Sequence, residues 1–77
     1  MARDDKIIRK MKQSPRSIRF EEMDGLLKRQ GFIATQRGSH VQYRHPNGTR
    51  FSIVKPHGKD KTVNQNAVKE VVDRLGL

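Results

Sequence analysis

Two turn signals that interrupt a stretch of alternating polar and apolar residues place the strongest constraint on the fold of this 77-residue chain. The segment Pro46-Asn47-Gly48 is typical of a type I turn followed by a glycine with positive φ, which makes a three-residue hairpin loop. This loop pairs Tyr43 with Phe51, whereas a two-residue loop would pair Tyr43 with Ser52 and mix apolar and polar side chains on both faces. The sequence therefore predicts a hairpin in which Tyr43 pairs with Phe51.

A tight turn at Gly38-Ser39 predicts one more strand, with Arg37 opposite His40. One face of the resulting three-stranded sheet then carries mainly apolar side chains: Phe32, Ala34, Val41, Tyr43, Phe51 and Ile53. The opposite face carries mainly polar and basic side chains, with two aliphatic residues at its margins: Thr35, Arg37, His40, Gln42, Arg44, Arg50 and Ser52, with Ile33 and Val54. Because antiparallel sheets commonly bury one face, we expect helices to cover the apolar side.

Amphipathic helical patterns flank the strands at residues 20–31 and 63–77. The apolar positions at helical spacing are Phe20, Met23, Leu26 and Leu27 in the first segment and Val68, Val71, Val72 and Leu75 in the second. Gly25 inside the first helix costs about 1 kcal/mol relative to alanine, which indicates that another group approaches it closely. The predicted fold class is α+β, a three-stranded antiparallel meander in the order α-β-β-β-α with both helices on one face.

The formal net charge of +9 is distributed unevenly along the chain. Residues 1–19 and residues 32–62 each sum to +5, while the two predicted helices sum to −1 and 0. A solubilising surface would intersperse both signs on all elements, so the uneven excess favours a polyanionic partner, most often nucleic acid.

Residues 1–17 form a basic arm before the predicted domain at 18–77. Ile7, Ile8 and Met11 make a short apolar stripe, and Ser14-Pro15 separates it from the first predicted helix. The pattern fits a short helix that docks on the domain or on a partner, and it equally fits a flexible basic tail that contacts RNA.

Composition excludes several other classes of protein. The chain has no cysteine, which excludes a disulfide framework and the common thiolate zinc sites. No apolar run is long enough to span a membrane or to serve as a secretory signal, because Ile7 and Ile8 are followed at once by Arg9 and Lys10. We therefore expect a cytoplasmic protein with no membrane partner.

Short motifs spread over residues 18–77 resemble the HicA family of toxins. The matching residues are Leu26-Leu27, Gly31-Phe32, Arg37-Gly38-Ser39-His40, Tyr43, His45-Pro46, Gly48, Pro56, Gly58-Lys59 and Leu75-Gly76-Leu77. The resemblance implies a double-stranded-RNA-binding-domain-like fold and a ribonuclease that cleaves messenger RNA and is silenced by a HicB antitoxin. It implies no cofactor and no small-molecule substrate.

The resemblance assigns the catalytic histidine of the family to His40, which the register places on the polar face. His57 matches a position where the family often has histidine, whereas Val41 departs from a second family histidine and is expected in the core. Histidine, with a reference pKa near 6.5, can remove or supply a proton during RNA cleavage at neutral pH. Asp60 is the only acidic residue between positions 32 and 62, which favours a metal-independent reaction and no metal site.

Basic and polar residues of the sheet and of the following loop are the candidate RNA contacts. These are Arg37, Ser39, Gln42, Arg44, Arg50, Lys55, His57, Lys59 and Lys61. The predicted strands place His45 on the opposite face from His40, so we expect it to be a hairpin residue. Three functions remain open: a ribonuclease toxin, an RNA-binding module of the same fold without catalysis, and a domain that binds an acidic protein.

Overall fold

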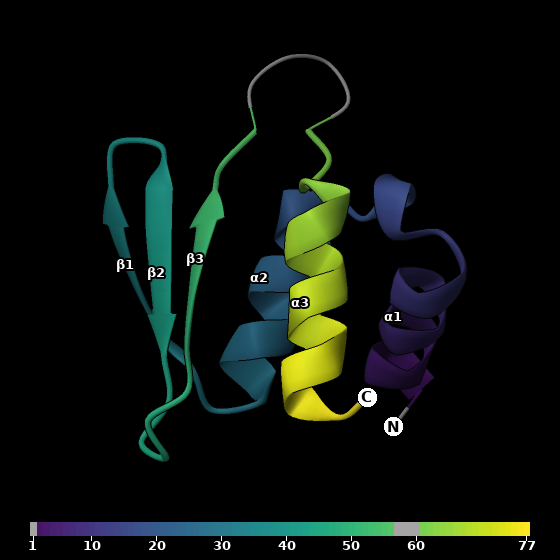
Figure 1. Cartoon of the computed structure of the whole chain (residues 1–77), viewed down its shortest axis with the longest axis horizontal. Helices are drawn as coiled ribbons and strands as arrows, with labels where there is room; N and C mark the ends of the chain where they lie inside the picture. Colours follow the sequence, from purple (N-terminus) through teal and green to yellow (C-terminus); the bar gives the residue numbers. More distant parts are fainter. Residues whose placement is uncertain (1, 57–60) are drawn as a thin grey trace.

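The computed structural model describes residues 2–56 and 61–77. Helix α1 (Ala2–Gln13) and a one-turn 3-10 helix η1 (Pro15–Ser17) precede α2 (Phe20–Arg29). Three strands follow, β1 (Ile33–Arg37), β2 (His40–Arg44) and β3 (Arg50–Val54), and the chain ends with α3 (Gln65–Leu75). The strands form one antiparallel sheet in the order β1-β2-β3, and α2 and α3 lie on one face of it (Figure 1). The predicted α+β fold with α-β-β-β-α order is confirmed.

The register of both hairpins agrees with the turn chemistry. Tyr43 pairs with Ala34 on one side and with Phe51 on the other, and Arg37 pairs with His40. In the second loop the Gly48 N–H donates to the carbonyl of His45 over 2.9 Å, and Gly48 has a φ of +95°. Asn47 does not have the positive φ that a two-residue type I′ loop would require, so this is a three-residue loop that ends in a glycine whose backbone other residues adopt only with strain.

The core lies between the apolar face of the sheet and the two covering helices. Its buried side chains are Ile7, Met11, Ile18, Met23, Leu26, Leu27, Phe32, Val41, Tyr43, Phe51, Ile53, Val63, Val68 and Val71. Tyr43 is fully buried, and its hydroxyl donates a 2.7 Å hydrogen bond to Asp24 Oδ1 of α2. Burial together with this neighbouring carboxylate raises the pKa of Tyr43 above its usual value. The same side chain therefore fills the core and fastens β2 to α2.

Both covering helices are shorter than their sequence patterns indicated. The helix expected at 20–31 ends at Arg29, and Gly31 follows with a φ of +98°. The helix expected at 63–77 begins at Gln65, because the Asn64 side chain accepts from the N–H of Asn66 and caps it. Its end at Leu75 is followed by Gly76 in the left-handed conformation.

Helix α1 packs against α2 and α3 on the side away from the sheet (Figure 1). Ile7 and Met11 of α1 are buried in the core, and Ile8 packs against it. Residues 2–13 of the arm are therefore a docked helix in this structure, and they add a third layer to the two that the sequence predicted.

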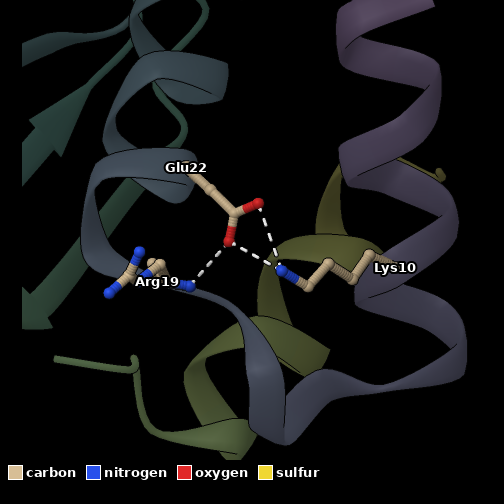
Figure 2. Close-up of polar contacts among 3 residues, drawn as sticks. All are labelled: Lys10, Arg19 and Glu22. Atoms are coloured by element: carbon tan, nitrogen blue, oxygen red, sulfur yellow. Dashed lines mark hydrogen bonds and ion pairs between the residues drawn. The ribbon is translucent and has the colours of Figure 1, made fainter. Parts of the chain in front are cut away.

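Two ion pairs fasten α1 to α2. Lys10 Nζ lies 3.1 Å from Glu22 Oε1, an oxygen that also accepts a 2.9 Å hydrogen bond from the backbone N–H of Arg19 (Figure 2). Arg29 Nε donates to Asp4 Oδ1 over 2.6 Å. A Cβ atom at Gly25 would lie 3.0 Å from Arg29 Nη1, so the close approach that the sequence indicated at this glycine is made by the arginine that holds α1.

Candidate nucleic-acid interface

Alternation along the strands places nine side chains on the side of the sheet that none of the described helices covers, and we call this surface the exposed sheet face. Pairing arranges it in three rows: Arg37, His40 and Val54; Thr35, Gln42 and Ser52; Ile33, Arg44 and Arg50. All nine residues are exposed, as the sequence predicted. Their identities make this face basic, and none of them is acidic.

The exposed sheet face is hollowed at two adjoining places. The first hollow, of about 230 Å³, is lined by Thr35, Arg37, His40, Gln42 and Arg44. The second, of about 180 Å³, is lined by Gln42, Arg44, Arg50, Phe51 and Ser52. Because Gln42 and Arg44 line both, the two hollows adjoin along β2.

The guanidinium groups on this face are not used in the ion pairs of the described residues. Those pairs join Lys10 to Glu22, Lys28 to Asp24, Arg29 to Asp4 and Arg74 to Glu70, all on or between helices. Arg37, Arg44 and Arg50 therefore present positive charge that no described carboxylate neutralises. A planar guanidinium binds phosphate with two parallel N–H donors, so a face of this kind suits a sugar-phosphate backbone.

His40 is the first residue of β2, directly after the Gly38-Ser39 turn, and it is exposed. Its neighbour across β1 is Arg37 and its neighbour across β3 is Val54. Directly opposed side chains on a sheet have Cβ atoms about 5 Å apart, so His40 and Arg37 can both contact one bound group. Among the described residues that line the two hollows, His40 is the only histidine.

The remaining predicted RNA contacts that the structure describes do not line these two hollows. Ser39 is half-buried, and its carbonyl accepts a 2.6 Å hydrogen bond from the Lys55 N–H, which ties the β1–β2 turn to the chain leaving β3. Lys55 and Lys61 line another hollow, of about 280 Å³, together with Phe20, Glu21, Asp24 and Pro56. The Lys55 ammonium lies 5.6 Å from the centre of the Phe20 ring. His57 and Lys59 lie outside the described residues.

Thr35 and Ser52 line the hollows but were not among the predicted RNA contacts. The signal that identifies them is the strand register, because both stand beside Gln42 in the middle row. Neither hydroxyl carries charge, so composition alone gives no reason to select them.

His45 has the structural role that the sequence indicated. It is half-buried, its ring centre lies 5.0 Å from that of Phe32, and its Nδ1 accepts a 3.1 Å hydrogen bond from the N–H of Asn47. These contacts hold the second hairpin loop against the end of the core, on the opposite side of the sheet from His40.

Residues 2–56 and 61–77 contain no group of three histidine or acidic side chains close enough to hold a metal ion. Within the same residues, no helix is long and apolar enough to cross a membrane.

Comparison with protein families gives one match. The family model described as the HicA toxin of bacterial toxin-antitoxin systems matches residues 20–77. The matched region runs from α2 to the end of the chain and includes the whole exposed sheet face, whereas α1 and η1 lie outside it. No curated protein and no solved structure matches the chain.

Proposed function

The chain belongs to the HicA toxin family, and from this premise we propose that it is a ribonuclease that cleaves messenger RNA without a metal ion and uses His40 to transfer a proton. The observation that carries the proposal is the position of His40, exposed on an acid-free basic face and directly opposite Arg37. A phosphate bound by Arg37 would lie within reach of the imidazole.

The proposed reaction conserves every atom of the RNA chain. The 2′-oxygen of a ribose forms a bond to the adjacent phosphorus while the bond from phosphorus to the 5′-oxygen breaks. The 2′-hydroxyl loses a proton, the departing 5′-oxygen gains one, and the products end in a 2′,3′-cyclic phosphate and a 5′-hydroxyl. His40 makes one of these two transfers and water makes the other, while arginine stabilises the charge on the phosphate.

The sharpest test compares His40→Ala with Arg44→Ala, two exposed positions on the same strand and in the same hollow. In buffer containing EDTA and saturating RNA, His40→Ala should lower the cleavage rate by about 10²–10⁴-fold. Arg44→Ala should mainly raise KM, because loss of a phosphate contact weakens binding. Thermal unfolding of both variants should match that of the wild type, because exposed side chains contribute little packing.

Three results would decide against parts of this proposal. If the wild type cleaves RNA and His40→Ala cleaves it at the same rate, His40 is not the group that transfers the proton. If the wild type binds RNA but does not cleave it, the protein is a non-catalytic RNA-binding module that uses the same basic face. If the wild type cleaves only after a divalent metal is added, the metal-independent reaction is wrong.

The partner that we propose for the toxin is a HicB-like antitoxin. A coding sequence for such a protein beside that of this chain, and loss of RNA cleavage when equimolar antitoxin is added, are the expected observations. A protein that binds the chain tightly but leaves RNA binding and cleavage unchanged would instead favour a role in binding an acidic protein at some other surface.

A further inference from the structure

The exposed sheet face has two cationic ends separated by an uncharged middle. Arg37 and His40 stand side by side in one outer row, and Arg44 and Arg50 stand side by side in the other. His40 and Arg44 are four residues apart on one strand, which corresponds to about 13 Å. The row between them consists of Thr35, Gln42 and Ser52, which are polar but uncharged.

The arginines at opposite ends of the face, Arg37 and Arg50, do not line a common hollow. Arg37 lines only the first hollow and Arg50 only the second, while Arg44 lines both. Two anionic groups therefore fit the face better than one. Because the hollows adjoin along β2, the two groups can belong to the same chain.

We propose that one RNA strand binds along β2 through two phosphates, the scissile phosphate between Arg37 and His40 and a remote phosphate between Arg44 and Arg50. This inference rests on the proposed ribonuclease function, and it defines the substrate as an oligonucleotide that extends beyond the cleaved linkage. A dinucleotide, with a single phosphodiester, occupies only one end of the face.

The face is built to contact the backbone rather than the bases. None of its nine side chains is Phe, Tyr or Trp, the residues on which single-stranded nucleic acids usually stack their bases. Three guanidinium groups and three uncharged hydroxyl or amide side chains supply hydrogen bonds to phosphate and ribose instead. Cleavage should consequently depend on the length of the RNA more than on its base sequence.

The two ends contribute to different kinetic constants. Arg37 touches the phosphate whose charge changes during the reaction, so it stabilises the transition state and acts on kcat. Arg50 touches a phosphate that is the same before and during the reaction, so it contributes uniform binding and acts on KM. Arg37 is thus a catalytic residue and Arg50 is a substrate-binding residue, although both are exposed arginines on edge strands of one sheet.

Steady-state kinetics on a dinucleotide and on a hexanucleotide of the same base separate these roles. Arg37→Ala should lower kcat by about 10²-fold on both substrates. Arg50→Ala should raise KM for the hexanucleotide and lower the ratio of kcat/KM for the hexanucleotide to that for the dinucleotide. Lys69→Ala, which removes an exposed charge from α3, is the control and should keep the wild-type ratio.

The inference is wrong if Arg50→Ala keeps the wild-type ratio of kcat/KM for the two substrates, or if Arg37→Ala changes KM alone.

The inference can also be tested without cleavage, by measuring the binding of the hexanucleotide to the His40→Ala protein at several salt concentrations. Arg37→Ala and Arg50→Ala should each reduce the slope of log affinity against log salt by about 0.7. Unchanged slopes would overturn the two-phosphate inference, whereas reduced slopes in a wild-type protein that cleaves nothing would overturn only the ribonuclease.

Discussion

The two outer layers of the molecule use basic residues in opposite ways. On the α1 side, Lys10 and Arg29 each bind a carboxylate, and these pairs lie between helices that also bury Ile7 and Met11. On the exposed sheet face, the arginines make no ion pair with any described residue. The net charge of the chain does not distinguish basic residues that are paired within the fold from those that pair with no described residue.

The position of acidic residues is therefore as informative as the number of basic ones. Asp4, Glu22 and Asp24 pair with Arg29, Lys10 and Lys28, so these three cations are neutralised within the fold. None of the nine residues of the exposed sheet face is acidic, so their positive charge remains available to a polyanion. Lys10 and Arg29 should therefore matter to stability, and the arginines of the sheet to RNA binding.

Met11→Ala should give the largest effect on the α1 side, a loss of about 2–3 kcal/mol in the free energy of unfolding. Met11 is 1% exposed, so truncation leaves a cavity between α1 and the layer below it. Urea unfolding measures the loss, and Gln13→Ala, an exposed change on the same helix, is the matched control. RNA affinity of the folded protein should be unaffected. Equal stability of Met11→Ala and the wild type would mean that α1 does not dock in solution.

Removal of one arginine from each layer should give smaller effects of two kinds. Arg29→Ala should lower the free energy of unfolding by up to about 1 kcal/mol, because it breaks the pair with Asp4. Arg29→Ala should leave the salt dependence of RNA affinity unchanged.

Arg44→Ala should have the opposite pattern of effects. It should reduce the slope of log RNA affinity against log salt by about 0.7, with little change in stability. If both variants change the slope of log RNA affinity against log salt equally, RNA contacts both layers. The proposed difference between the two layers is then wrong.

The smallest expected effect is the pH dependence of the contact in Figure 2. Burial alone raises the pKa of Glu22, but the hydrogen bonds from the Arg19 N–H and the Lys10 ammonium outweigh it, so its pKa is lowered from 4.5. A carboxyl whose pKa is lower in the folded state stabilises the fold above its unfolded pKa. This contribution is lost as the pH falls through the folded value.

Glu22→Gln should therefore cost stability at neutral pH and progressively less below pH 4.5. The cost should stay below about 1 kcal/mol, because Lys10 is substantially exposed. Unfolding curves at a series of pH values measure it, with Glu21→Gln as a control that removes the same charge from an exposed neighbour. If the cost does not change with pH, Glu22 stabilises the fold through packing or helix capping, and its charge does not contribute.

The sheet was predictable from the sequence because its turns and its alternation point to the same register. Gly48 and Gly38 both have positive φ, as the predicted turns require, and a shift of one residue would have exposed Tyr43. The placement of His40 on the outer face followed from that register. Its catalytic role remains a prediction, as do the RNA contacts.

Neither the docking of α1 nor the positions of Lys55 and Lys61 could be predicted from the sequence. The physical reasons differ. Three apolar residues in α1 do not distinguish a docked helix from a free one, since the deciding pairs with Glu22 and Arg29 join segments distant in sequence. Lys55 lies just beyond β3, where alternation ends, and its ammonium lies over Phe20. Charge alone could not show that Lys55 and Lys61 share a hollow with acidic residues.

The layered arrangement has a practical consequence for attaching this protein to a surface. The start of α1 and the end of α3 both lie on the side of the molecule away from the sheet (Figure 1). An affinity tag or a biosensor tether at either end would leave the exposed sheet face turned toward the solution. An RNA that binds that face should then give the same association rate whichever end is tethered.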